Sequence, residues 1–63
     1  MKKKLYEFRL FPTKNKKYTR EHCCDSEEQA LFELWGMMYA LYFEYKKPYA
    51  ELYCNGKLIK RVR

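Results

Sequence analysis

Hydrophobic and polar side chains alternate over residues 4–11, Lys-Leu-Tyr-Glu-Phe-Arg-Leu-Phe. A period of two is typical of a strand with one buried face, and it puts Tyr6, Phe8 and Leu10 on the same side. We expect Pro12 to end this strand, because proline has no backbone N–H to donate. Residues 13–17 are polar and predict a turn. Alternation over residues 18–24 is irregular, so a second strand there stays optional.

A helix is predicted over about residues 27–46. Asp25 and Ser26 are both N-cap types, and each has Glu or Gln three positions later, at Glu28 and Gln29 respectively. Lys46 and Lys47 suit the C-terminal end, and Pro48 prevents continuation. Apolar residues recur at spacings of three and four and so share one buried face. They are Leu31, Leu34, Met38, Leu41 and Tyr45, flanked by Ala30, Trp35, Met37 and Tyr42.

Asn55-Gly56 between two apolar runs predicts a hairpin of residues 49–54 and 57–62, because a type I′ turn needs positive φ at both central residues. A regular two-residue turn pairs Cys54 with Lys57 and Glu51 with Lys60. One face of the hairpin is then expected to pack on the helix, with Ala50, Leu52, Cys54 and Ile59. The other is expected to hold Tyr49, Tyr53, Leu58 and Val62.

Together these elements predict a single domain over residues 1–63 with a small α+β fold of order β(β)αββ. An antiparallel sheet of three or four strands carries one helix on one face. The alternation and the helical spacing predict a shared core. Its members are Tyr6, Phe8, Leu10, Leu31, Leu34, Met38, Leu41, Leu52 and Ile59.

The formal net charge is +6, and the charges are segregated along the chain. Residues 1–20 and 46–63 are rich in Lys and Arg, whereas residues 21–45 carry only acidic charges. Such a distribution predicts a molecule with a basic side. No apolar run is long enough for a membrane helix or a signal peptide, so we expect a cytoplasmic protein without a membrane partner. Lys, Tyr and Phe are abundant, and the AT-rich codons of these residues favour a phage or mobile-element origin.

The residues suited to metal binding or catalysis are sparse. His22, Cys23, Cys24 and Cys54 are candidate zinc ligands, but adjacent cysteines fit structural zinc spacing poorly. We therefore expect free thiols, no metal and no cofactor, with a disulfide to Cys54 only under oxidising conditions. One histidine and two glycines leave no nucleophilic triad and no phosphate-binding loop. The chain is predicted to be non-catalytic, with no small-molecule substrate.

Basic and aromatic residues are predicted to share the sheet face away from the helix, where Arg9, Arg20 and Lys60 would accompany Phe11, Tyr49 and Tyr53. Stacking bases and pairing phosphates is one way to bind single-stranded nucleic acid. The plainer interpretation is that these are ordinary strand formers and solvated charges. The predicted partner is nucleic acid, a complex that handles it, or an acidic protein. The predicted contacts are Arg9, Lys14, Lys16, Lys17, Arg20, Tyr49, Tyr53, Lys60 and Arg61, with Lys2, Lys3, Lys4 and Arg63 at the rim.

The outward side of the predicted helix is unusually apolar. Phe32, Tyr39 and Phe43 point there, next to Gly36 and Ala40 in a small-xxx-small spacing. Such a surface predicts a protein interface, either a homodimer through the helix or a host-protein contact of a phage-type inhibitor or adaptor. The alternative is that the rings bury against the first strand or a loop.

Overall fold

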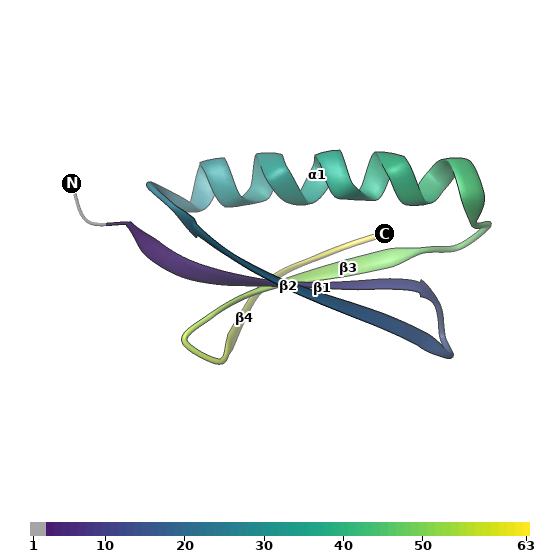
Figure 1. Cartoon of the computed structure of the whole chain (residues 1–63), viewed down its shortest axis with the longest axis horizontal. Helices are drawn as coiled ribbons and strands as arrows, with labels where there is room; N and C mark the ends of the chain where they lie inside the picture. The colour runs from purple at the N-terminus through teal and green to yellow at the C-terminus, as the bar shows by residue number, and fades with distance from the viewer. Residues whose placement is uncertain (1–2) are drawn as a thin grey trace.

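The computed structural model describes residues 3–63, so Lys2 lies outside the described residues. Strand β1 spans Lys4–Thr13, β2 spans Lys16–Cys24, helix α1 spans Glu27–Glu44, β3 spans Tyr49–Cys54 and β4 spans Lys57–Val62. The strands form one antiparallel sheet of order β2-β1-β3-β4, and α1 crosses one face of it (Figure 1). The predicted α+β class is confirmed, and the optional second strand is present.

The β1–β2 hairpin is longer than predicted. Strand β1 does not end at Pro12 but continues to Thr13, and the turn contains only Lys14 and Asn15. The pairing of β1 with β2 is irregular between Leu10 and Thr13, the stretch that contains Pro12. Pro12 is tolerated because a residue in a bulge does not have to donate a backbone hydrogen bond to the neighbouring strand.

Helix α1 begins at one of the two predicted caps. The Ser26 hydroxyl accepts a hydrogen bond from the Gln29 N–H at 3.2 Å, and the Gln29 side chain accepts one from the Asp25 N–H at 2.9 Å. The helix ends at Glu44, where the Tyr45 N–H donates to the Leu41 carbonyl at 2.9 Å. Lys46 and Lys47 therefore lie beyond the helix rather than in its last turn.

The core lies between α1 and the central strands β1 and β3. Every predicted core position is buried or packs against the buried cluster; Leu31, Leu41 and Ile59 do the latter. The buried cluster consists of Tyr6, Phe8, Leu10, Cys24, Ala30, Leu34, Met38, Ala50, Leu52 and Val62. Placing Val62 on the opposite face was wrong.

A bulge in the β3–β4 hairpin explains that error. Asn55 and Gly56 have φ values of 54° and 77°, as a type I′ turn requires. The predicted pairing of Cys54 with Lys57 is confirmed, but the register then shifts, and Glu51 faces Arg61 instead of Lys60. In a regular strand, residues 59 and 62 would project to opposite faces. One extra residue on β4 lets both of these apolar side chains pack on the core.

Candidate anion-binding site

The sheet face away from α1, called here the open face, brings together several predicted contact residues. Phe11 lies opposite Tyr49, Arg9 opposite Glu51, and Glu7 opposite Tyr53. The Phe11 and Tyr49 rings stack with centroids 4.4 Å apart and 9° between their planes. Cross-strand partners project to the same side of a sheet, so these pairs form one aromatic and charged surface.

Arg20 and Lys60 do not belong to the open face, which corrects the prediction. Arg20 lies opposite Phe8 and Lys60 opposite Leu52, and both partners are core residues that face the helix. Both cations therefore lie on the helix side of the outer strands. The bulge on β4 brings Arg61 onto the open face in place of Lys60.

The arginines in the middle of the open face are already bound to carboxylates. Arg9 forms an ion pair with Glu7, and its guanidinium carbon lies 3.9 Å from the Tyr53 ring centroid. Arg61 donates from Nε and Nη2 to Glu51. Hydrogen bonds to these carboxylates raise the pKa of both arginines above the usual value. This region is a neutralised network rather than the predicted basic platform.

The unbalanced positive charge lies at one end of the molecule. The β1–β2 turn, the segment after α1 and the end of β4 all lie toward this end, because the end of β1 and the end of β4 both pair with the start of β3 (Figure 1). The opposite end holds the start of α1 with Asp25, Glu27 and Glu28, near Lys3, Lys4 and Lys57. Charge thus separates along the 38 Å long axis. We define the basic end as Lys14, Lys16, Lys17, Lys46, Lys47, Arg61 and Arg63.

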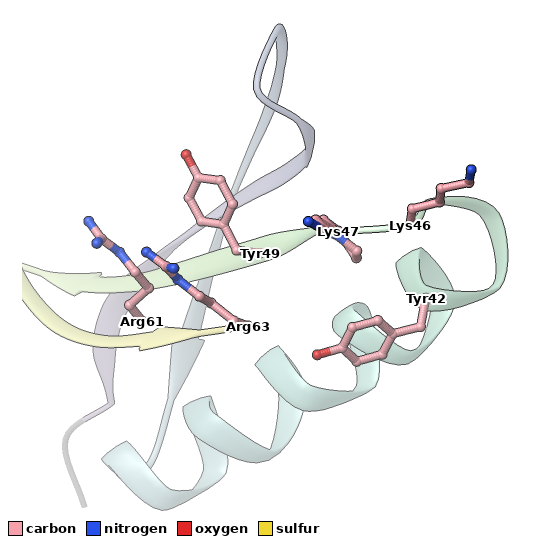
Figure 2. A pocket seen from close by; sticks show the side chains of 7 residues that line it. Tyr42, Lys46, Lys47, Tyr49, Arg61 and Arg63 are labelled. Carbon is pink, nitrogen blue, oxygen red and sulfur yellow. The ribbon is translucent and has the colours of Figure 1, made fainter.

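A hollow of about 590 Å³ lies at the basic end. Figure 2 shows Tyr49, Arg61 and Arg63 on one side of β3 and β4, Tyr42 approaching from the helix, and Lys46 directed outward. No acidic residue is among the described residues that line the hollow. They are Tyr42, Lys46, Lys47, Pro48, Tyr49, Arg61 and Arg63.

Two local features position the basic groups around this hollow. Arg61 uses Nε and Nη2 for Glu51, which fixes its guanidinium plane and leaves Nη1 for another acceptor. Pro48 is buried and directs the chain from the helix into β3, so Lys47 lines the same hollow as Arg61 and Arg63. The hollow can accept an anion with a flat ring attached, since cations and tyrosine faces border the same space.

The outward side of α1 is exposed, so burial of its rings against the first strand or a loop was the wrong alternative. Phe32 is 81% exposed, Tyr39 66% and Phe43 90%. Gly36 and Ala40 are exposed beside them, and a Cβ on Gly36 would meet nothing within 4 Å. Trp35 and Tyr42, which were predicted to flank the core, are also exposed and widen this surface. We define the aromatic helix face as Phe32, Trp35, Gly36, Tyr39, Ala40, Tyr42 and Phe43.

The thiols and the histidine do not assemble as the four-ligand set considered from the sequence. Cys23 lies opposite Leu5 and is exposed on the open face, and Cys54 is on β3, separated from β2 by β1. Cys24 and His22 lie together on the helix side, where Glu33 of α1 meets them. Burial, together with the adjacent carboxylate, raises the pKa of the Cys24 thiol to about 11.

Comparison of the chain with protein-family models, curated proteins and solved structures finds no match. Among the described residues, no helix is long and apolar enough to cross a membrane. No function is therefore transferred from a relative.

Proposed function

We propose that the protein is a small non-catalytic binding protein whose basic end holds the phosphate backbone of a single-stranded nucleic acid. The observation that carries this proposal is the hollow at the basic end, which four cations and two tyrosines line without an acidic residue. Lysine and arginine neutralise phosphates, and tyrosine faces accept stacked bases of any sequence. A volume of about 590 Å³ lies in the range of small-molecule sites, so the hollow is large enough for one nucleotide unit.

The lysines of the β1–β2 turn and of the start of β2 extend this surface beyond the hollow. Lys14, Lys16 and Lys17 are all exposed and follow β1, whose Phe11 stacks on Tyr49 at the hollow. A strand seated in the hollow would continue toward this turn, because the potential stays positive in that direction. Toward the middle of the open face it would meet Glu7 and Glu51.

The proposed interface therefore overlaps only partly with the contacts predicted from the sequence. It retains Lys14, Lys16, Lys17, Tyr49 and Arg61. Arg9 and Tyr53 belong to the neutralised network, and Arg20 and Lys60 face the other way. It adds Tyr42, Lys46, Lys47 and Arg63. We place this binding in the cytoplasm, which fits the three free cysteines.

Fluorescence anisotropy with a labelled thymidine oligonucleotide tests the proposal. Lys47→Glu and Arg63→Glu should each weaken binding at least tenfold, whereas Lys57→Glu, the same charge change at the opposite end, should have little effect. Equal losses in all three variants would mean that only total charge matters. Absence of binding at low salt, or preference for a duplex of equal length, would contradict the proposal.

A second candidate function, favoured by the aromatic helix face, is a protein contact. The five rings of this face are exposed by 42–90%, which amounts to roughly 500–800 Å² per chain. A standard interface buries about 800 Å² per partner. We infer that a second copy of the chain covers this face, because two copies with antiparallel helices bring the acidic first turn of each α1, with Glu27 and Glu28, toward Lys46 and Lys47 of the other copy. A host protein on the same surface is the alternative.

A further inference from the structure

Three different metal-binding side chains converge where β2 meets α1. His22 and Cys24 are two residues apart on β2 and so project to the same side, and Glu33 reaches them from the helix. Glu33 Oε1 lies 2.8 Å from His22 Nδ1, and Glu33 Oε2 lies 3.2 Å from Cys24 Sγ. Each Glu33 oxygen thus meets one of the two β2 side chains, and Cys24 Sγ lies 3.7 Å from His22 Nδ1.

We propose that His22, Cys24 and Glu33 bind a divalent zinc ion. Zinc bonds of about 2.3 Å to sulfur and about 2.0–2.2 Å to nitrogen and oxygen, arranged tetrahedrally, place the donor atoms roughly 3.3–3.6 Å apart. The three observed separations surround this range. A small rotation of the Glu33 carboxylate brings all three donors to bonding distance of one ion.

The donor set selects the metal. A thiolate and an imidazole favour zinc over magnesium or calcium, which prefer oxygen ligands. Binding releases the Cys24 thiol proton to solvent, so the thiolate and the Glu33 carboxylate neutralise the charge of the ion. The expectation that this chain binds no metal rested on the poor spacing of the adjacent Cys23 and Cys24. The proposed set omits Cys23 and Cys54 and includes instead the Glu33 carboxylate, nine residues after Cys24.

The fourth position of the ion faces solvent. A hollow of about 330 Å³ adjoins the cluster and is lined by Arg20, Glu21, His22, Glu33 and Met37. His22 is more than half exposed, whereas Cys24 is buried. Three protein ligands and one open position allow a water molecule or an external ligand to complete the tetrahedron.

The ion would also have a structural role. All residues of β2 except Cys24 are exposed, so this edge strand has little apolar packing on the helix. An ion held by two residues of β2 and one of α1 joins the two elements. Metal binding should then stabilise the fold, since ligand binding to the native state shifts the unfolding equilibrium.

The site can be tested by titrating the reduced, chelator-treated protein with Co²⁺. The absorbance of bound Co²⁺ reports thiolate ligation and tetrahedral geometry. The wild type should show a thiolate-to-cobalt band that zinc displaces. Cys24→Ser should lose the band, and Cys23→Ser, the adjacent exposed thiol on the other face, should keep it. A band that is absent in the wild type, or that depends on Cys23 instead, would overturn the proposal.

Because Cys24 is buried, its variant could fail to fold, and the partly exposed ligands provide a second measurement. Zinc should raise the melting temperature of the wild type and of Cys23→Ser. In Glu33→Gln and His22→Ala, which remove one ligand each, zinc affinity should fall at least tenfold and the stabilisation should vanish. Equal stabilisation of all four proteins by zinc would place the ion elsewhere and refute the site.

Discussion

Glu51 of β3 and Arg61 of β4 lie opposite each other, and Arg61 Nε and Nη2 donate to Glu51 Oε2 at 2.9 and 2.7 Å. The Tyr53 hydroxyl donates to Glu51 Oε1 at 2.9 Å, so both carboxylate oxygens are satisfied. The Glu51 side chain is only 8% exposed. A buried carboxylate is tolerated at the centre of the sheet because its neighbours on β3 and β4 hold it.

Replacing Arg61 should destabilise the protein more than replacing Lys60, the preceding residue of β4. Arg61→Leu leaves Glu51 with the Tyr53 hydroxyl as its remaining donor. Leaving the Glu51 carboxylate short of donors is expected to cost roughly 1–3 kcal/mol of unfolding free energy. Lys60→Leu, at an exposed position next in the chain, should change stability by less than about 0.5 kcal/mol. Urea unfolding measures both, and equal midpoints in the two variants would contradict the prediction.

Glu51 should also contribute to acid sensitivity. Burial opposes its ionisation, but hydrogen bonds from Arg61 and Tyr53 outweigh burial and hold its pKa below the ordinary value of 4.5. A carboxyl with a lowered folded-state pKa stabilises the fold fully above about pH 4.5. That stability is lost as the pH falls through the lower folded value. Unfolding free energy measured from pH 7 down to acid should therefore decline less steeply in Glu51→Gln than in the wild type, and parallel curves would exclude this role.

Local signals in the sequence were sufficient for the turn at Asn55-Gly56 and for the helix start, because a few adjacent residues determine both. The register beyond the turn was not predictable in this way. The bulge arises because Ile59 and Val62 both pack on a core that residues distant in sequence build. Glu33 was missed for the same reason, since only the packing of α1 on β2 brings a helical carboxylate to His22.

The start of α1 provides a test of a local signal. Both Asp25 and Ser26 had suitable spacing, and the structure uses the Ser26 side chain. Ser26→Ala should therefore cost about 1 kcal/mol, because the Gln29 N–H loses its acceptor. Asp25→Ala should cost less, since Asp25 contributes its backbone N–H to Gln29. Thermal unfolding compares the two, and a larger loss in Asp25→Ala would mean that the other cap is used.

The salt dependence of nucleic-acid affinity should report how many cations contact phosphates. Single-stranded nucleic acid gives a slope of log affinity against log salt of about −0.7 per neutralised phosphate. Four contacts, from the cations that line the hollow, predict a slope of about −3. Arg63→Ala should reduce its magnitude by about 0.7. A slope near zero would instead favour a protein partner on the aromatic helix face, because apolar contacts are not screened by salt.

Self-association should occur through α1 with the two helices antiparallel. A two-fold axis between Met37 and Met38 places Phe32 of one copy opposite Phe43 of the other, and Gly36 opposite Tyr39. Gly36 of one copy then leaves room for the Tyr39 ring of the other. This contact would explain the glycine, because a Cβ at position 36 would meet nothing within its own chain. The same arrangement brings the acidic first turn of α1 in each copy toward Lys46 and Lys47 of the other.

Ala40→Glu should therefore give a monomer that still folds, because this position is exposed on the outward side of α1. Gly36→Gln separates association from folding more sharply. It should raise helix stability by roughly 0.5–1 kcal/mol, since glycine is a poor helix former, while its side chain fills the space of the facing ring and weakens the dimer. Leu58→Glu adds a charge at an exposed apolar site on the sheet and should leave assembly unchanged. Sedimentation equilibrium distinguishes these outcomes. A wild type that stays monomeric at high concentration would exclude the dimer and leave the aromatic helix face to a different protein.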